Sequence, residues 1–148
     1  MKKQAYTMIA MVVLVGSMAV AAQAQTNGGT QLVASIPFEF SVGNKTLRAG
    51  EYTVCQVNPA SDHAVLQLRS RDGRASAMVQ MGSVVGKAQE SAKLIFNRYG
   101  NHYFFAQAWV DGESSGLQAS KTRAERATER ELAGIKMATE SVAFSPRR

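Results

Sequence analysis

Apolar and polar residues alternate along much of the chain beyond residue 30. In the segment 36–42, every second residue is Ile, Phe or Val, an arrangement that places these side chains on one face of a pleated strand. Alternation or enrichment in β-branched residues predicts further strands at 51–57, 65–71, 74–81, 93–99 and 102–110. Asp72-Gly73 and Gly100-Asn101 divide the last four of these segments into two pairs, and such residues favour tight turns. We therefore expect two β-hairpins.

A different pattern begins after Val110. Thr122 and Glu125 form a capping box, in which the threonine hydroxyl and the glutamate carboxylate satisfy free N–H groups at the start of a helix. The sequence predicts a helix at about 123–133, ended by Gly134. Its apolar stripe is thin, so we expect the helix to pack on the sheet rather than form a core of its own.

These elements together predict an all-β fold with one C-terminal helix. The short strands, six to eight in number and mostly joined as hairpins, are typical of a small antiparallel sandwich or barrel. The sequence does not distinguish the sandwich from the barrel, because the register between strands that are not consecutive is not encoded locally.

The first 24 residues have the features of a signal peptide. Lys2 and Lys3 precede an uncharged run over 8–22, which is shorter than the roughly 20 apolar residues of a membrane-spanning helix. Ala22 and Ala24 supply the small residues that signal peptidase accepts, so we expect cleavage before Gln25. The alternative is an uncleaved N-terminal anchor.

Cleavage would leave a single domain outside the cytoplasm. Residues 25–30 form a polar, flexible lead-in, residues 31–144 the β-rich domain, and residues 145–148 a loose tail. No second apolar run follows, so we expect no membrane span after removal of the signal peptide. The predicted location is the periplasm or the extracellular space.

Composition limits the chemistry. The chain has 148 residues and one cysteine, Cys55, which excludes an internal disulfide framework and a metal site made of thiolates alone. Loss of Lys2 and Lys3 would leave 15 basic residues against 11 acidic ones, a net charge of +4. This mild excess does not indicate nucleic-acid binding. We expect no cofactor.

Four motifs occur in an order that resembles a known family. They are Ile36-Pro-Phe-Glu-Phe40, Leu47-Arg-Ala-Gly-Glu-Tyr-Thr-Val54, Phe96-Asn-Arg-Tyr-Gly100 and Arg123-Ala-Glu-Arg126. The order is similar to that of a family of short exported bacterial proteins with no assigned function. Arg48 stands where that family usually has proline. The resemblance implies export and a β-rich fold, and it carries over no catalytic residue.

Gly112-Glu-Ser114-Ser-Gly116 matches the nucleophile-elbow pattern of hydrolases. That motif requires a parallel sheet and a histidine that follows the serine, whereas His63 and His102 both precede Ser114. We therefore interpret the segment as a loop, and predict no catalytic residue. The two histidines have no partner at ligand spacing, so no metal site is predicted either.

Arginines form the one feature that indicates binding. They lie near the first hairpin turn and along the predicted helix: Arg69, Arg71, Arg74, Arg123, Arg126 and Arg130. Guanidinium groups bind phosphate and carboxylate, so an anionic envelope glycan or a lipid head group is a candidate partner. The alternative is an ordinary solvated surface, because acidic residues are interspersed among them.

Aromatic residues gather in the second hairpin. Strict alternation places Tyr103, Phe105 and Trp109 on one face of the strand and Phe104 on the other. Both faces are apolar, so one belongs to the core. We expect the helix to cover the other face, with a self-association surface or a ligand cavity as alternatives.

The sequence thus predicts an exported, non-enzymatic β-domain that serves as a binding or structural module. One alternative is a small β-barrel that carries an apolar ligand, which requires a cavity above about 300 Å³. Another is a homo-oligomeric surface component, and a hydrolase is the least supported.

Overall fold

The computed structural model describes residues 31–59 and 61–145. The expected cleavage site at Ala22, Ala24 and Gln25, the lead-in 25–30 and residues 146–148 lie outside this part. The strands before the first long hairpin are β1 (Leu32–Ile36), β2 (Phe40–Val42), β3 (Lys45–Leu47) and β4 (Gly50–Gln56). The remaining elements are β5 (Ala64–Ser70), β6 (Ser76–Val85), β7 (Lys93–Tyr99), β8 (His102–Trp109), β9 (Ser115–Ala119), α2 (Arg123–Glu131) and β10 (Ala138–Ser145).

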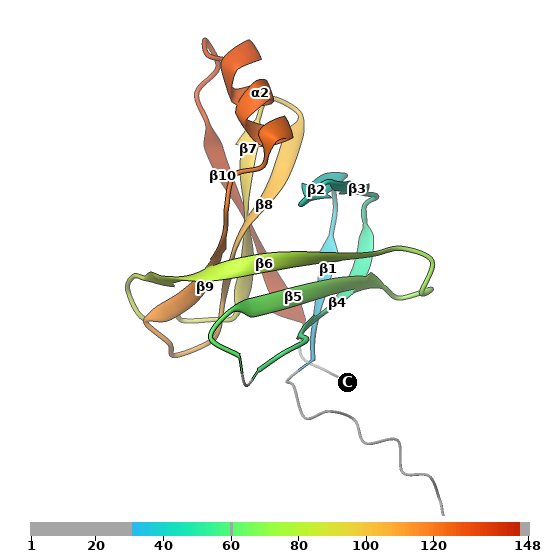
Figure 1. Cartoon of the computed structure of the whole chain (residues 1–148), viewed down its shortest axis with the longest axis vertical. Coiled ribbons are helices and arrows are strands. Elements are labelled where there is room, and N and C mark those ends of the chain that lie inside the picture. Colours follow the sequence, from blue (N-terminus) through green and yellow to red (C-terminus); the bar gives the residue numbers. More distant parts are fainter. Residues whose placement is uncertain (1–30, 60, 146–148) are drawn as a thin grey trace, which may run out of the picture.

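Eight of the strands close into an antiparallel barrel (Figure 1). Their order is β8-β7-β10-β1-β4-β5-β6-β9, and pairing of β9 with β8 closes the ring. The predicted all-β fold with a C-terminal helix is confirmed, and the barrel is the correct one of the two expected architectures. The closure depends on β1, which pairs with both β4 and β10.

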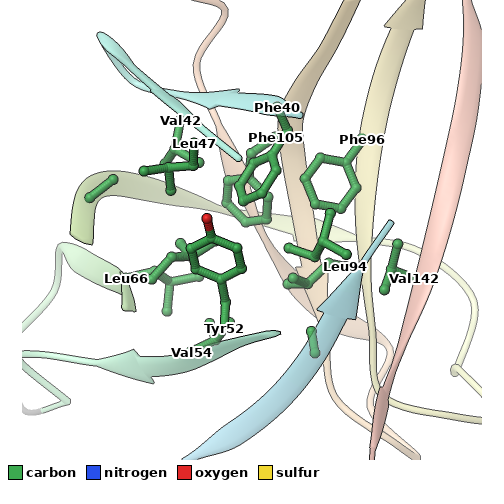
Figure 2. Close-up of a cluster of buried hydrophobic side chains, with 14 of the residues drawn as sticks. Phe40, Val42, Leu47, Tyr52, Val54, Leu66, Leu94, Phe96, Phe105 and Val142 are labelled. Carbon is green, nitrogen blue, oxygen red and sulfur yellow. The ribbon is translucent and has the colours of Figure 1, made fainter. Parts of the chain in front are cut away.

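The two ends of the barrel differ. Strand β9 pairs with β6 only over residues 81–85 and with β8 only at Gln107 and Ala108. Nearer the start of β8, Phe104 pairs instead with Ser41 of β2, in parallel, and β3 pairs with β2. The β2–β3 hairpin therefore lies over this end, and its apolar side chains enter the core (Figure 2).

Large side chains fill the core next to this hairpin. The ring of Phe96 packs edge-on against Phe40 and Phe105, with centroids 5.3 and 5.8 Å apart. Tyr52 packs edge-on against Phe40 at 5.2 Å, and its hydroxyl donates to the backbone oxygen of Arg48. Figure 2 shows these side chains gathered between β2, β4 and β8. This end of the barrel is thus a packed interior.

The second hairpin departs from strict alternation. Ile95 pairs with Gln107 but Phe96 pairs with Phe105, so Ala106 is an extra residue in a β-bulge. After the bulge, each side chain of β8 points to the face opposite to the one that strict alternation predicts. Phe105 still faces the core, but Trp109 pairs with Lys93 on the outside of the barrel. The expectation that Phe105 and Trp109 share a face is wrong.

The helix packs through a polar contact. Thr122 caps α2 by accepting from the Glu125 backbone N–H at 3.1 Å, which confirms the threonine half of the predicted capping box; the Glu125 carboxylate accepts from β7 instead. The Glu125 side chain is only 3% exposed, and its Oε1 accepts from Asn97 Nδ2 at 2.8 Å and from the Tyr99 hydroxyl at 3.2 Å.

The predicted apolar stripe consists of Ala124, Thr128, Leu132 and Ile135. Ala124 is exposed, whereas a Cβ added at Gly100 would lie 3.7 Å from Leu132 Cδ1 and 3.9 Å from Ile135 Cδ1. The helix therefore packs on β7 through Glu125, and the C-terminal part of the stripe lies against the β7–β8 turn.

Candidate functional site

A partly open cavity of about 640 Å³ lies at the end of the barrel opposite the β2–β3 hairpin. In an antiparallel barrel the end of one strand lies beside the start of its neighbour. Strand ends and strand starts therefore surround the cavity together. We call this region the mouth. Its lining from the strands is Leu32, Val54, Cys55, Gln56, Leu66, Ser83, Ala108, Trp109, Ser115, Gly116, Leu117 and Phe144, and from the loops Pro59, Ala92, Val110, Asp111 and Glu113.

The inner wall of the mouth continues the core. Val54 and Leu66 are 4% and 5% exposed and belong both to the core cluster and to the cavity lining. Leu117 and Phe144 pack against the same core from β9 and β10. The cavity therefore has an apolar floor formed by the barrel itself.

Trp109 packs from the outside of the barrel against the backbone at one side of the mouth, and it contributes to the lining there. A Cβ added at Gly116 would lie 2.7 Å from the indole Cδ2, and one added at Gly86 would lie 2.9 Å from Cη2. The indole N–H donates to Gln107 Oε1 at 2.9 Å. The ring thus packs directly on the backbone of two glycine positions, where a larger residue has no room.

The loop over 110–114 is held against the loop over 86–89. The backbone N–H of Gly86 donates to the Ser114 oxygen at 2.8 Å, and that of Gly112 donates to the Gln89 oxygen at 2.9 Å. Gly112 has a φ of +77°, a value that favours glycine. These bonds fix the position of the segment that carries Asp111 and Glu113.

Three exposed valines lie at strand ends on the side of the mouth, and one of them, Val110, lines the cavity. Val57 follows β4, Val85 ends β6 and Val110 follows β8, and their side chains are 48%, 80% and 54% exposed. These three strands all end at the mouth. Apolar surface therefore extends from the cavity to its rim, a feature of binding sites for apolar partners.

The six predicted anion-binding arginines fall into two groups. Arg69, Arg71 and Arg74 lie at the β5–β6 turn, whereas Arg123, Arg126 and Arg130 lie on α2, which Figure 1 places at a different part of the molecule. The structure does not bring the two groups together.

The first arginine group is already partly neutralised. Arg71 Nη1 lies 3.1 Å from both carboxylate oxygens of Glu51. Hydrogen bonds from the Ser70 hydroxyl and then from the Arg74 backbone N–H lower the pKa of Asp72, which keeps a second negative charge at this turn. Anion binding here stays a prediction.

Strand β8 separates the residues of the hydrolase-like pattern. His102 begins β8 and Ser114 lies beyond its other end. Eight residues at about 3.3 Å each put the two ends of the strand roughly 25 Å apart. His63 lies before β5, where it lines a separate depression with Lys121. In residues 31–59 and 61–145, no three His, Cys, Asp or Glu side chains are grouped as metal ligands.

Cys55 is half-buried on β4, and its thiol lies 3.9 Å from Gln67 Oε1. It is one of the residues that line the mouth.

Sequence reasoning did not identify the mouth. The ligand-cavity alternative expected the aromatic residues of the second hairpin to line it, but only Trp109 of that set does so, while Phe96 and Phe105 fill the core. The mouth consists of the ends of strands that are distant in sequence. No short segment therefore carries a recognisable pattern for it.

No protein-family model matches the chain, and no match was found among curated proteins or among solved structures. Helix α2, formed within the described residues, lacks the length and apolar character that a membrane crossing requires.

Proposed function

We propose that the protein is a non-enzymatic binding module that holds a small, mainly apolar molecule in the mouth of its barrel. The observation that carries this proposal is the cavity of about 640 Å³. This size lies within the range of about 300–1,000 Å³ found for small-molecule sites, which are usually apolar and largely formed before the ligand binds. Of the alternatives considered from the sequence, the apolar-ligand carrier agrees best with this geometry.

The apolar floor supplies the driving force. A ligand that buries about 200 Å² of apolar surface gains about 5 kcal/mol from the hydrophobic effect. Loss of translational and rotational freedom on binding costs several kcal/mol. Even before this cost, a gain of about 5 kcal/mol corresponds to a dissociation constant of only about 0.2 mM. We therefore expect weak binding of small apolar probes, and affinity that rises as a larger probe buries more apolar surface.

The N-terminal sequence supports a site of action outside the cytoplasm. The charged residues Lys2 and Lys3, the apolar run and the Ala22–Ala24 pattern are typical of a signal peptide, and the family resemblance carries the same expectation of export. We propose that the ligand is a molecule that the protein meets in the periplasm or beyond.

The test is a fluorescence titration with N-phenyl-1-naphthylamine, an uncharged apolar fluorophore. Ser83 lines the cavity from β6, so Ser83→Phe fills part of it. Ser76 lies on the same strand and pairs with Arg69. The next pair, Ala77 with Leu68, faces the core, so Ser76 faces outward. Ser76→Phe therefore adds the same ring outside the barrel. We expect saturable binding by the wild type and by Ser76→Phe, and at least a tenfold weaker affinity for Ser83→Phe.

Two results would overturn the proposal. One is the absence of saturable binding to the wild type. The other is equal affinity in all three proteins, because binding would then occur outside the cavity. Circular dichroism on each variant establishes that the barrel is intact before the affinities are compared.

A further inference from the structure

We infer that the ligand is a cationic amphiphile, with an apolar body and one positively charged end. This inference rests on the proposed function, and it concerns the identity of the polar group that the mouth accepts. It follows from the distribution of charge around the cavity and from the way in which the charged segment is held.

The charged side chains that line the mouth are acidic. Among the described residues that form the cavity, only Asp111 and Glu113 carry a charge, and no Lys, Arg or His is part of the lining. The whole chain, by contrast, has a net charge of +6. The charges on the lining are thus all negative, although Lys93 pairs with Trp109 beside it and Lys87 lies on the loop bonded to 110–114. The two carboxylates attract a positive charge placed at the rim and repel a negative one.

The two carboxylates are separated from the apolar floor. Both residues are exposed and lie on the loop after β8, whereas Val54 and Leu66 form the buried inner wall. The apolar body of a ligand therefore contacts the buried inner wall, and its polar end remains near the loop. Water at the rim keeps a charged end solvated, so this orientation avoids burying a charge.

The loop that carries the carboxylates is fixed before a ligand arrives. Backbone N–H groups of Gln89 and Gly112 donate to the Glu113 and Gln89 oxygens at 3.2 and 2.9 Å, and the Glu113 N–H donates to the Val110 oxygen at 3.3 Å. Binding then pays little to order this segment. The backbone that carries both carboxylates is therefore already ordered.

The test compares three probes with the same decyl chain and different ends. They are decyltrimethylammonium, which is positive, decanol, which is neutral, and decanoate, which is negative; all are used below their micelle-forming concentrations. Binding is measured by calorimetry at low and at moderate salt. We expect the cation to bind about tenfold more tightly than decanoate at low salt, with decanol between them, and the difference to shrink as salt screens exposed charges.

Matched variants assign the preference to the mouth. Asp111→Asn combined with Glu113→Gln removes both lining charges, and we expect the three probes to bind this protein within about twofold of one another. Asp62→Asn combined with Glu90→Gln removes two exposed charges from neighbouring loops that do not line the cavity, and we expect the preference for the cation to persist. All variants are made in the full-length chain, so the positive charges of Arg147 and Arg148 are the same in every protein compared.

The outcomes separate this inference from the proposed function. Equal binding of the three probes, or tighter binding of decanoate, overturns the cationic preference while the apolar site stands. A preference that survives Asp111→Asn with Glu113→Gln also overturns it. If no probe binds, the proposed function fails as well.

Discussion

At the scale of single residues, Trp109 and the two glycines beneath it decide the shape of the mouth. The indole ring lies within contact distance of the Gly86 and Gly116 backbones, and its N–H is satisfied by Gln107. This packing leaves no volume for a side chain at either glycine. The wall of the mouth between β8 and β9 is therefore sensitive to the addition of one methyl group.

We predict that Gly116→Ala destabilises the protein by about 1–3 kcal/mol, the usual cost of overpacking a filled site. The reason is that the new Cβ would lie 2.7 Å from the Trp109 ring and 3.0 Å from the Ala108 oxygen, so the ring or the strand must move. Urea unfolding followed by far-UV circular dichroism measures the loss.

Gly134→Ala is the control for this prediction. Nothing lies within 4 Å of a Cβ added at Gly134, and its φ is not positive. We expect its free energy of unfolding to stay within about 0.5 kcal/mol of the wild type, as for most surface substitutions. Equal effects of the two substitutions would show that the contact with Trp109 does not determine the cost.

At the scale of elements, one carboxylate makes the polar contact between helix α2 and the barrel. Glu125 accepts from Asn97 and Tyr99 of β7, and its backbone is part of the N-terminal cap. Burial, followed by the charge of Glu125, raises the pKa of Tyr99 above its ordinary value of 10.0. The phenol therefore stays protonated and remains a donor at neutral pH.

We predict that Glu125→Ala costs about 1–3 kcal/mol, because the buried Tyr99 hydroxyl and the half-buried Asn97 amide on β7 would lose their acceptor. Tyr99 is among the most completely buried side chains, so water cannot readily replace the lost partner. Thermal and urea unfolding both measure this loss, and amide hydrogen exchange shows whether the helix opens first.

Glu131→Ala is the matched substitution at the exposed end of the same helix. We expect its effect to be below about 0.5 kcal/mol. If Glu125→Ala is equally mild, the polar contact is not what attaches α2 to the barrel.

Local patterns in the sequence predicted the elements that local interactions form. The capping residues Thr122 and Glu125 give the start of α2, and Asp72-Gly73 gives the β5–β6 turn, with Gly73 at a φ of +73°. The same reasoning failed where one residue changes the register. Nothing in the alternating run 102–110 indicates that Ala106 is an extra residue, so Trp109 was assigned to the wrong face. The segment 36–42 is also divided into β1 and β2 around Pro37.

At the scale of the whole molecule, the barrel is closed at one end and partly open at the other. Phe40, Val42 and Leu47 of the β2–β3 hairpin enter the core at the closed end. Strand β9 completes the ring near the mouth, where it contributes Leu117 to the cavity. A filled interior at one end and an apolar hollow at the other are what a small binding barrel requires.

This arrangement was beyond sequence reasoning because it depends on pairings between distant strands. Leu32 and Phe144 both line the mouth, yet they are separated by most of the chain, and they meet only because β1 pairs with β10. Six to eight short strands were expected, but their alternation is equally consistent with a sandwich. The mouth forms only when the ring of strands closes, so no local sequence pattern describes it.

A heteronuclear NMR titration with decanol tests the central claim most directly. We predict shifts that saturate at one ligand per protein and concentrate at the mouth, in residues 54–56, 108–111 and 115–117, while amides of the β2–β3 hairpin change little. Shifts that are absent at saturating decanol, or that are spread over the outside of the barrel, would contradict the assignment of the cavity as a binding site.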